Sequence, residues 1–325
     1  TLSVQSKPFV GLAQFLVDFY ARRARRILPA LLVVVLIISI LICLFNPEPR
    51  SIINTGIASL FGVSNFYLLD LATDYFAQAS YLNPFLHTWS LGVEEQFYII
   101  FPIILWARRF VFESQRKRRC VDLLLILASC VSFVAYVALY RQNPSLAYFL
   151  MPCRFWELAF GAFLVLFGRI ESPLRAHFAN NLSRFAALAI VSCLFLPPEL
   201  GVLATPAAVG FVSLLLVSLQ PGSCIYRLLS QHNMLWAGKR SYSMYLWHFP
   251  LISLCKWTVG INFLTALFVL VATVVLSQIT FVYIENPIRF SFSKLPGFQT
   301  ILLALSMIAI SSAFLRGVLA RPSNQ

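Results

Sequence analysis

The sequence contains few charged residues, and few of these are acidic. Asp, Glu, Lys and Arg together make up 11% of the 325 residues, whereas soluble domains average about 25%. The motifs of several enzyme classes are also missing: there is no P-loop, no GxGxxG after a strand, no GxSxG and no HExxH. These absences argue against nucleotide hydrolases, dinucleotide-dependent oxidoreductases, α/β-hydrolases and zinc peptidases.

The cysteines lack the spacing of a metal site or a disulfide framework. None of the seven forms a CxxC pair, and most lie inside apolar runs. We interpret them as small apolar core residues. They are Cys43, Cys120, Cys130, Cys153, Cys193, Cys224 and Cys255.

Apolar residues account for 59% of the chain, and they occur in runs of membrane-spanning length. Ile27–Phe45 and Phe263–Val282 are examples, each close to the ~20 residues that a transmembrane helix needs. The runs do not alternate as the strands of a membrane barrel do. We therefore predict an all-α fold, a polytopic integral membrane helix bundle in contact with membrane lipids.

The distribution of basic residues sets the number of spans. Treating 46–85 as a non-spanning or re-entrant segment leaves about nine transmembrane helices, and the loops between them then alternate in charge. The predicted spans lie near residues 27–45, 86–106, 121–140, 155–168, 185–200, 203–219, 241–258, 262–284 and 299–315.

Of the 25 Lys and Arg residues, 19 fall on one side of this arrangement and 6 on the other. The positive-inside rule makes the richer side cytoplasmic, so the N-terminus lies inside and the C-terminus outside the plasma (inner) membrane. The net charge of +13 is thus explained by topology, and we expect no nucleic-acid partner.

This topology predicts that Arg50 and Asp74 lie on the same side of the membrane. Arg50→Cys and Asp74→Cys, each made in a Cys43→Ala background, should react alike with a membrane-impermeant thiol reagent. Labelling from opposite sides would mean that the segment between them crosses the bilayer.

A polar stripe interrupts one apolar run. His87, Glu94 and Tyr98 fall within about 20° of one another on a helix of 100° per residue, and Ser90 lies nearby. Buried carboxylates in a membrane are functional candidates because their burial is costly, although an interhelical hydrogen-bonded staple is the alternative. Glu95 lies about 100° around the helix, so we expect it to matter less than Glu94.

Three further clusters carry polar groups. Arg154 and Glu157 are spaced to pair on one helix face, and Gly161 is expected to allow close helix packing; a structural role is favoured there. Ser241 and His248 share a face around Tyr245, where a satisfied interhelical partner is again the favoured interpretation. Glu285 and Arg289 end a span, either as an ion pair or as a helix-terminal anchor.

Four arginines, Arg22, Arg23, Arg25 and Arg26, precede the first predicted span. Basic residues at the cytoplasmic end of a helix are ordinary topology signals. Four within five residues exceed what orientation requires, and arginines one turn apart suit bidentate binding of phosphate.

These stretches, in this order, resemble the membrane-bound acyltransferase family 3, the O-acetylases of lipopolysaccharide, peptidoglycan and other glycans. The resemblance covers about residues 18–290 and rests on FYARRARRILPAL, SNFY, HTWSLGVEEQFYIIFP, RFWELAFG, GKRSYSMYLWHFPL and YIENPIR.

The resemblance implies that an acetyl group passes from cytoplasmic acetyl-coenzyme A, the donor substrate, to a glycan or lipid-linked sugar outside the membrane. It assigns Arg23 and Arg26 to the donor phosphates, and the carboxylate of the closing motif matches Glu285. The stripe of His87 and Glu94 would line the route between donor and acceptor.

The sequence departs from the family pattern at its start. Family members carry two further helices upstream, the first with the catalytic histidine, and none of His87, His177, His232 or His248 occupies that place. We therefore expect a truncated form that does not complete transfer as it stands. The alternatives are a non-catalytic paralogue or partner protein, and a proton-coupled glycolipid transporter.

The expected organisation has three parts. Residues 1–26 form a cytoplasmic lead with the arginine cluster, 27–296 form the acyltransferase-like membrane domain, and 297–325 add a further transmembrane helix and an outside tail. That helix would place the C-terminus where some family members carry an SGNH-type hydrolase domain.

Overall fold

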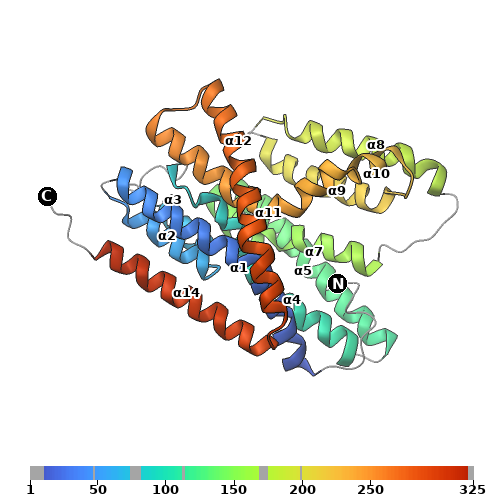
Figure 1. Cartoon of the computed structure of the whole chain (residues 1–325). Coiled ribbons are helices and arrows are strands. Elements are labelled where there is room, and N and C mark those ends of the chain that lie inside the picture. Colours follow the sequence, from blue (N-terminus) through green and yellow to red (C-terminus); the bar gives the residue numbers. More distant parts are fainter. Residues whose placement is uncertain are drawn as a thin grey trace. The chain divides into compact units, whose positions relative to one another are not determined.

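The fold is built from helices that are long enough to cross a membrane. The computed structural model describes residues 11–46, 48–73, 82–111, 114–167, 175–197 and 200–320, and all regular secondary structure in these ranges is helical (Figure 1). Six stretches within these ranges have the length and apolar composition of a span, namely Leu12–Phe45, Leu86–Val111, Gln115–Gln142, Gly201–Ser218, Phe263–Ser293 and Gly297–Leu319. The chain is thus an all-α, multi-pass membrane protein, as predicted.

Each of the nine predicted spans overlaps a helix, although the number that cross the bilayer stays a prediction. The three that lie outside the six apolar stretches overlap α7 (Met151–Phe167), α8 (Arg175–Cys193) and α11 (His232–Thr258). The first of these is only 17 residues long, and the last carries Lys239 and Arg240 in its first half.

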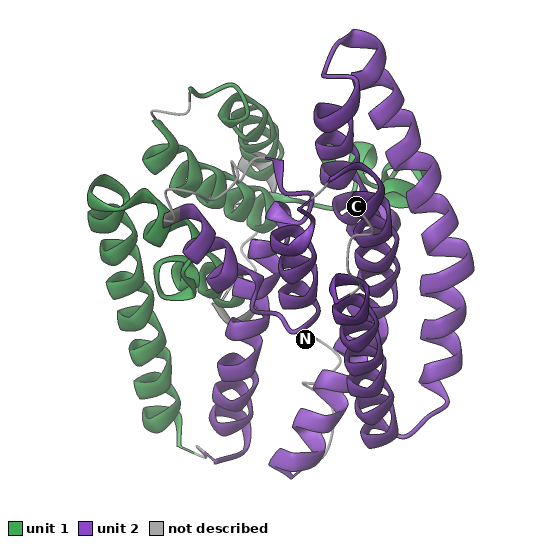
Figure 2. Ribbon diagram, turned by 90° about the vertical axis from the view of Figure 1, so that its left-hand side faces the viewer, with its two compact units in different colours: residues 1–7, 114–239 green, residues 8–113, 240–325 purple. Residues whose placement is uncertain are grey.

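The chain divides into two compact units (Figure 2). The described part of the first, drawn in green, contains α5 (Gln115–Gln142), α6 (Pro144–Phe149), α7, α8, α9 (Gly201–Ser218), α10 (Cys224–Leu229) and the start of α11. The second, drawn in purple, contains the remaining helices and most of α11. The clusters around Arg23, His87 and Glu285 all lie in the second unit.

The second unit is organised around α1 (Leu12–Phe45). This helix packs against α2 (Arg50–Leu60), α4 (Trp89–Trp106) and α14 (Gly297–Leu319), and Figure 1 shows α2 and α14 running beside it. It begins well before residue 27, so the predicted cytoplasmic lead is helical from Leu12 onward. Its buried face supplies much of the apolar core, including Leu31, Val35, Ile38 and Ile42.

Two short helices occupy the described part of the segment 46–85, namely α2 and α3 (Ser64–Thr73). An α2 of 11 residues rises only about 16 Å, too little to cross the bilayer. Buried hydroxyls and amides connect it to the start of α4. The Ser59 and Thr88 hydroxyls lie 2.6 Å apart, and the Asn83 amide donates to Thr55 Oγ1 at 2.8 Å.

The remaining elements of the second unit include two turns of π-helix. The 3₁₀ turn η3 (Leu86–Thr88) leads into α4, and the π-helical turn η4 (Ala107–Val111) follows it. The π-helical turn η6 (Phe281–Glu285) joins α12 (Phe263–Thr280) to α13 (Asn286–Ser293).

The first unit contains the ion pair expected between Arg154 and Glu157. Their side chains meet at 2.5 Å, with the guanidinium carbon 5.3 Å from the ring centres of both Tyr136 and Tyr148. Such cation–π packing of a buried arginine supports a structural role. The close packing expected at Gly161 is not seen among the described residues of this unit, because a Cβ there would meet none of their atoms within 4 Å.

The close glycine contact lies instead at Gly92 of α4. A Cβ at this position would stand 2.6 Å from Asn65 Oδ1 and 3.3 Å from the Gly62 carbonyl oxygen. Asn65 cannot easily yield, because its Oδ1 accepts a hydrogen bond of 2.8 Å from the Gln96 amide.

Gly92→Ala should therefore destabilise the protein by about 1–3 kcal/mol, the usual cost of overpacking. Gly210→Ala in α9 is the matched control, since a Cβ there meets no atom of the described residues within 4 Å and alanine is the better helix former by up to about 1 kcal/mol. Thermal unfolding in detergent should show a lower midpoint than the parent for Gly92→Ala and a higher midpoint for Gly210→Ala. Equal midpoints would show that α3 and α4 adjust without cost.

Candidate functional site

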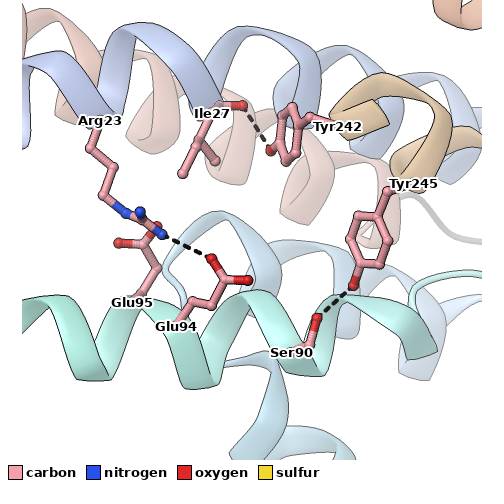
Figure 3. Close-up of polar contacts among 7 residues, drawn as sticks. All are labelled: Arg23, Ile27, Ser90, Glu94, Glu95, Tyr242 and Tyr245. Atoms are coloured by element: carbon pink, nitrogen blue, oxygen red, sulfur yellow. Dashed lines mark hydrogen bonds and ion pairs between the residues drawn. The ribbon is translucent and has the colours of Figure 1, made fainter. Parts of the chain in front are cut away.

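The centre of the candidate site is the guanidinium group of Arg23 on α1 (Figure 3). Its Nε donates to Glu95 Oε1 at 2.9 Å, and its Nη2 lies 3.5 Å from Glu94 Oε2, both on α4. The guanidinium carbon stands 3.6 Å from the ring centre of Tyr98, one turn further along α4. One cation is therefore held by two carboxylates and an aromatic face.

Hydrogen bonds to backbone carbonyls fix the helices around this cation. The Tyr20 hydroxyl donates to the Tyr98 carbonyl at 2.9 Å, which joins α1 to α4. The Tyr242 hydroxyl of α11 donates to the Ile27 carbonyl at 3.0 Å (Figure 3). Arg23 thus lies on α1 between Tyr20 and Ile27, the two positions at which tyrosine hydrogen bonds join this helix to α4 and α11.

The structure divides the predicted polar stripe into two groups. Ser90, Glu94 and Tyr98 follow one another along α4, but His87 lies in the preceding 3₁₀ turn. Glu94 and Tyr98 contact Arg23, whereas Ser90 Oγ lies 2.8 Å from the Tyr245 hydroxyl of α11 (Figure 3).

The expectation that Glu95 faces different surroundings from Glu94 was wrong. Both carboxylates reach the same guanidinium, and Glu95 is the closer and the more buried of the two, with 32% of its side chain exposed against 42%. A helical separation of 100° still allows two long side chains to converge on a group that approaches between them. Glu95 therefore joins the candidate site.

The four clustered arginines have four different environments. Arg23 contacts the carboxylates, and Arg25 Nη2 donates to the Leu295 carbonyl and to Thr300 Oγ1, both at 2.9 Å. Arg22 and Arg26 are exposed, and the charge of Arg26 acts on Glu285. Arg23 and Arg26, which the resemblance assigns to the donor phosphates, have no common protein partner among the described residues.

His87 packs against α11 through its ring. Its centroid lies 5.0 Å from that of Tyr245, 5.6 Å from that of His248 and 5.4 Å from that of Phe249, with the last pair stacked. The ring is buried, and neither of its nitrogens makes a hydrogen bond within the described part of the chain. The Tyr245 hydroxyl donates to the backbone carbonyl of His87.

The tautomer of neutral His248 follows from its hydrogen bond. Its Nδ1 lies 2.7 Å from the Tyr245 carbonyl oxygen, which only accepts, so Nδ1 carries the proton and Nε2 carries the lone pair. The predicted residues His87, Tyr245 and His248 are thus brought together, in a cluster distinct from the one at Arg23.

Glu285 is the last residue of the π-helical turn η6, a kind of local distortion that is frequent at functional sites. Its carboxylate accepts a hydrogen bond from the hydroxyl of Ser243, a buried residue of α11. The charges of Arg26 and Arg289 also act on it. Ser241, which the sequence pattern favoured, is exposed, so Ser243 replaces it as the inward-facing serine.

Sequence reasoning missed Tyr20, Glu95, Tyr242 and Ser243. Glu95 and Ser243 stand next to or two positions from residues that were selected, and only their partners on distant helices distinguish them from those residues. The contacts of Tyr20 and Tyr242 go to backbone carbonyls, which leave no pattern in the sequence. No group of three or more metal-ligating side chains occurs in the described ranges.

Comparison with known proteins assigns the sequence to a family. The acyltransferase domain family (Acyl_transf_3) matches residues 11–282, which include Arg23, both glutamates and Ser243. The chain belongs to the acyltransferase family. The resemblance predicted from the motifs is thereby confirmed.

The chain is also similar to curated proteins from three bacterial species. It is 30% identical to the peptidoglycan O-acetyltransferase OatA of Listeria monocytogenes over 290 residues, and 27% identical to the O-acetyltransferase OatA of Staphylococcus aureus over 293. YrhL of Bacillus subtilis, provisionally named as a peptidoglycan O-acetyltransferase, is 30% identical over 291. These alignments cover 84% of the chain but only 45–47% of the relatives. No solved structure matches the chain.

The contact between Ser243 and Glu285 yields a stability prediction. Ser243→Ala removes the hydrogen-bond donor from the partly buried Glu285 carboxylate. It should lower the free energy of unfolding by about 1.5–3 kcal/mol, the usual contribution of a hydrogen bond to a charged group. Ser241→Ala, at an exposed position two residues earlier on the same helix, is the control and should change stability little. Thermal unfolding of both variants measures the difference; equal effects would mean that Glu285 does not depend on Ser243.

Proposed function

We propose that the chain is the membrane part of an O-acyltransferase that moves an acetyl group from acetyl-coenzyme A to a hydroxyl of a glycan outside the plasma membrane. Peptidoglycan is the acceptor that the names of the relatives favour. The observation that carries this proposal is the family match, because residues 11–282 include the whole cluster around Arg23.

The geometry of Arg23 suits a phosphate-bearing donor. Glu95 holds Nε at 2.9 Å and so orients the guanidinium plane, while the contact from Nη2 to Glu94 is long, at 3.5 Å. The Nη1 and Nη2 edge can therefore turn to a phosphate group as a bidentate fork. Glu95 acts in this proposal as the residue that positions Arg23.

The local charge is compatible with an anionic donor. Two carboxylates face Arg23, but Arg22, Arg25 and Arg26 lie within one turn on the same helix. With Glu285 and Arg289, which also interact there, five arginines against three glutamates leave a net positive field, which attracts the phosphates of coenzyme A.

The transfer itself requires a defined movement of one proton. The acceptor oxygen attacks the thioester carbonyl carbon, the bond from carbon to sulfur breaks, and coenzyme A leaves as a thiolate. The proton released by the acceptor hydroxyl needs a base. We assign this role to Glu94, because its carboxylate is the more exposed of the pair and only loosely bound to Arg23.

Transfer of labelled acetyl groups from acetyl-coenzyme A to peptidoglycan fragments, measured in membrane vesicles that contain the full-length protein, tests this function. Arg23→Lys keeps the charge but loses the planar fork, so incorporation should fall about tenfold or more, as expected for loss of a charged hydrogen bond. Arg22→Lys is the matched control, since Arg22 is exposed and has no partner among the described residues. Absence of incorporation above vesicles without the protein would refute the function.

Substitution of the two glutamates should change different kinetic constants. Glu95→Gln should raise the KM for acetyl-coenzyme A because Arg23 is held less firmly, whereas Glu94→Gln should lower kcat because a base is lost. Steady-state kinetics normalised to folded protein separate the two effects. Identical changes in both variants would contradict the division of roles.

A further inference from the structure

A cavity of about 330 Å³ lies within the second unit, beside Arg23. Four segments form its walls: α1, the C-terminal end of α2, α4 and α14. The last of these lies beyond residue 282, outside the stretch that matches the family. The cavity is therefore completed by a helix that the acyltransferase domain itself does not supply.

The walls of the cavity are almost entirely apolar. Only four lining residues carry polar side-chain atoms or charges: Tyr20 and Arg23 of α1, Ser59 of α2 and Glu95 of α4. The others include Leu28, Leu31, Leu91, Ile301, Ala304 and Ile308.

The four polar side chains already have partners in the protein. Arg23 and Glu95 bind each other, the Tyr20 hydroxyl donates to the Tyr98 carbonyl, and Ser59 bonds with Thr88. An occupant therefore needs to satisfy no buried polar group, and a polar ligand would lose its own hydrogen bonds on entering. The lining favours a hydrocarbon.

The rim of the cavity continues onto the outer surface of the unit. Phe61, Ile99 and Leu305 line it and are each more than half exposed. In a multi-pass membrane protein, exposed residues of this kind face lipid, so hydrocarbon can enter sideways from the bilayer. An apolar cavity of 150 Å³ holds a benzene molecule, and this one is about twice as large.

From these observations we infer that the cavity binds one acyl chain of a membrane phospholipid. This lipid acyl chain enters the cavity between α4 and α14, lies along α1 and ends near Arg23. Binding of this kind buries apolar surface that would otherwise be an empty or wet gap between helices. The inference does not depend on the proposed transferase activity.

Photocrosslinking tests the inference directly. The full chain, reconstituted in nanodiscs with a phospholipid whose acyl chain carries a diazirine, should be labelled on residues 301–308 of α14 and on the facing turns of α1 and α4. Ala304→Leu fills the cavity and should abolish this labelling. Ala309→Leu makes the same change at an exposed position of α14, and its labelling should match the parent.

A second variant guards against misfolding of the first. Ala24→Leu fills the cavity from α1 at a partly buried position. After the protein has been delipidated in detergent, added phospholipid should raise the melting temperature of the parent and of Ala309→Leu. The increase should be smaller for the two cavity-filling variants.

Two results would overturn the inference. One is labelling of the cavity residues that is equal in the parent and in both filled variants. The other is displacement of the label by octanoyl-coenzyme A but not by unlabelled phospholipid, since the occupant would then be the acyl chain of a donor.

Discussion

The second unit depends on the need to neutralise a guanidinium group that lies between helices. Arg23 is only 16% exposed, and a charge removed from water is tolerated when it is paired and hydrogen-bonded. Two adjacent glutamates of α4 supply the pairing, and Tyr98 supplies an aromatic face. Because these contacts come from fixed positions on both helices, they set the register of α1 against α4.

The other polar contacts of α1 extend the same constraint to its neighbours. Arg25 binds the turn that precedes α14 and the first turn of that helix, and the carbonyl of Ile27 accepts from Tyr242 of α11. Apolar packing along α1 is non-directional and would allow the neighbours to slide or rotate. A few directional hydrogen bonds near one end of the helix remove that freedom and place the carboxylates, the tyrosines and the cavity together.

Much of the architecture could be predicted from composition and charge because the bilayer restricts the possible folds. Apolar runs predict helices, and a spacing of three or four residues correctly paired Arg154 with Glu157 and aligned Ser90, Glu94 and Tyr98. One error occurs where the backbone leaves the α-helical repeat. His87 lies in a 3₁₀ turn, so a period of 100° per residue misplaces it relative to Glu94 and Tyr98.

Contacts between distant helices were a second class of error. Nothing in the local pattern around Glu95 reveals that Arg23, 72 residues earlier, approaches between the two glutamates. Likewise, Ser241 and Ser243 are equally good candidates until the partner of one of them, Glu285, is known. A single sequence records which side chains a helix carries, but the partner of each depends on how the helices pack.

The position of the cavity gives the Arg23 cluster a physical reason to sit where it does. A charged pair beside an apolar cavity is shielded from water on that side, which strengthens the attraction between Arg23 and Glu95. Ile301, Ala304 and Ile308 of α14 line the same cavity as Arg23 and Glu95. Through this cavity α14 can influence the surroundings of the ion pair without contacting its charged groups. A hydrocarbon chain in this space would keep water away from the pair on one side while the other edge of the guanidinium stays open to an anion. The same arginine can thus be anchored to the fold and still bind a phosphate.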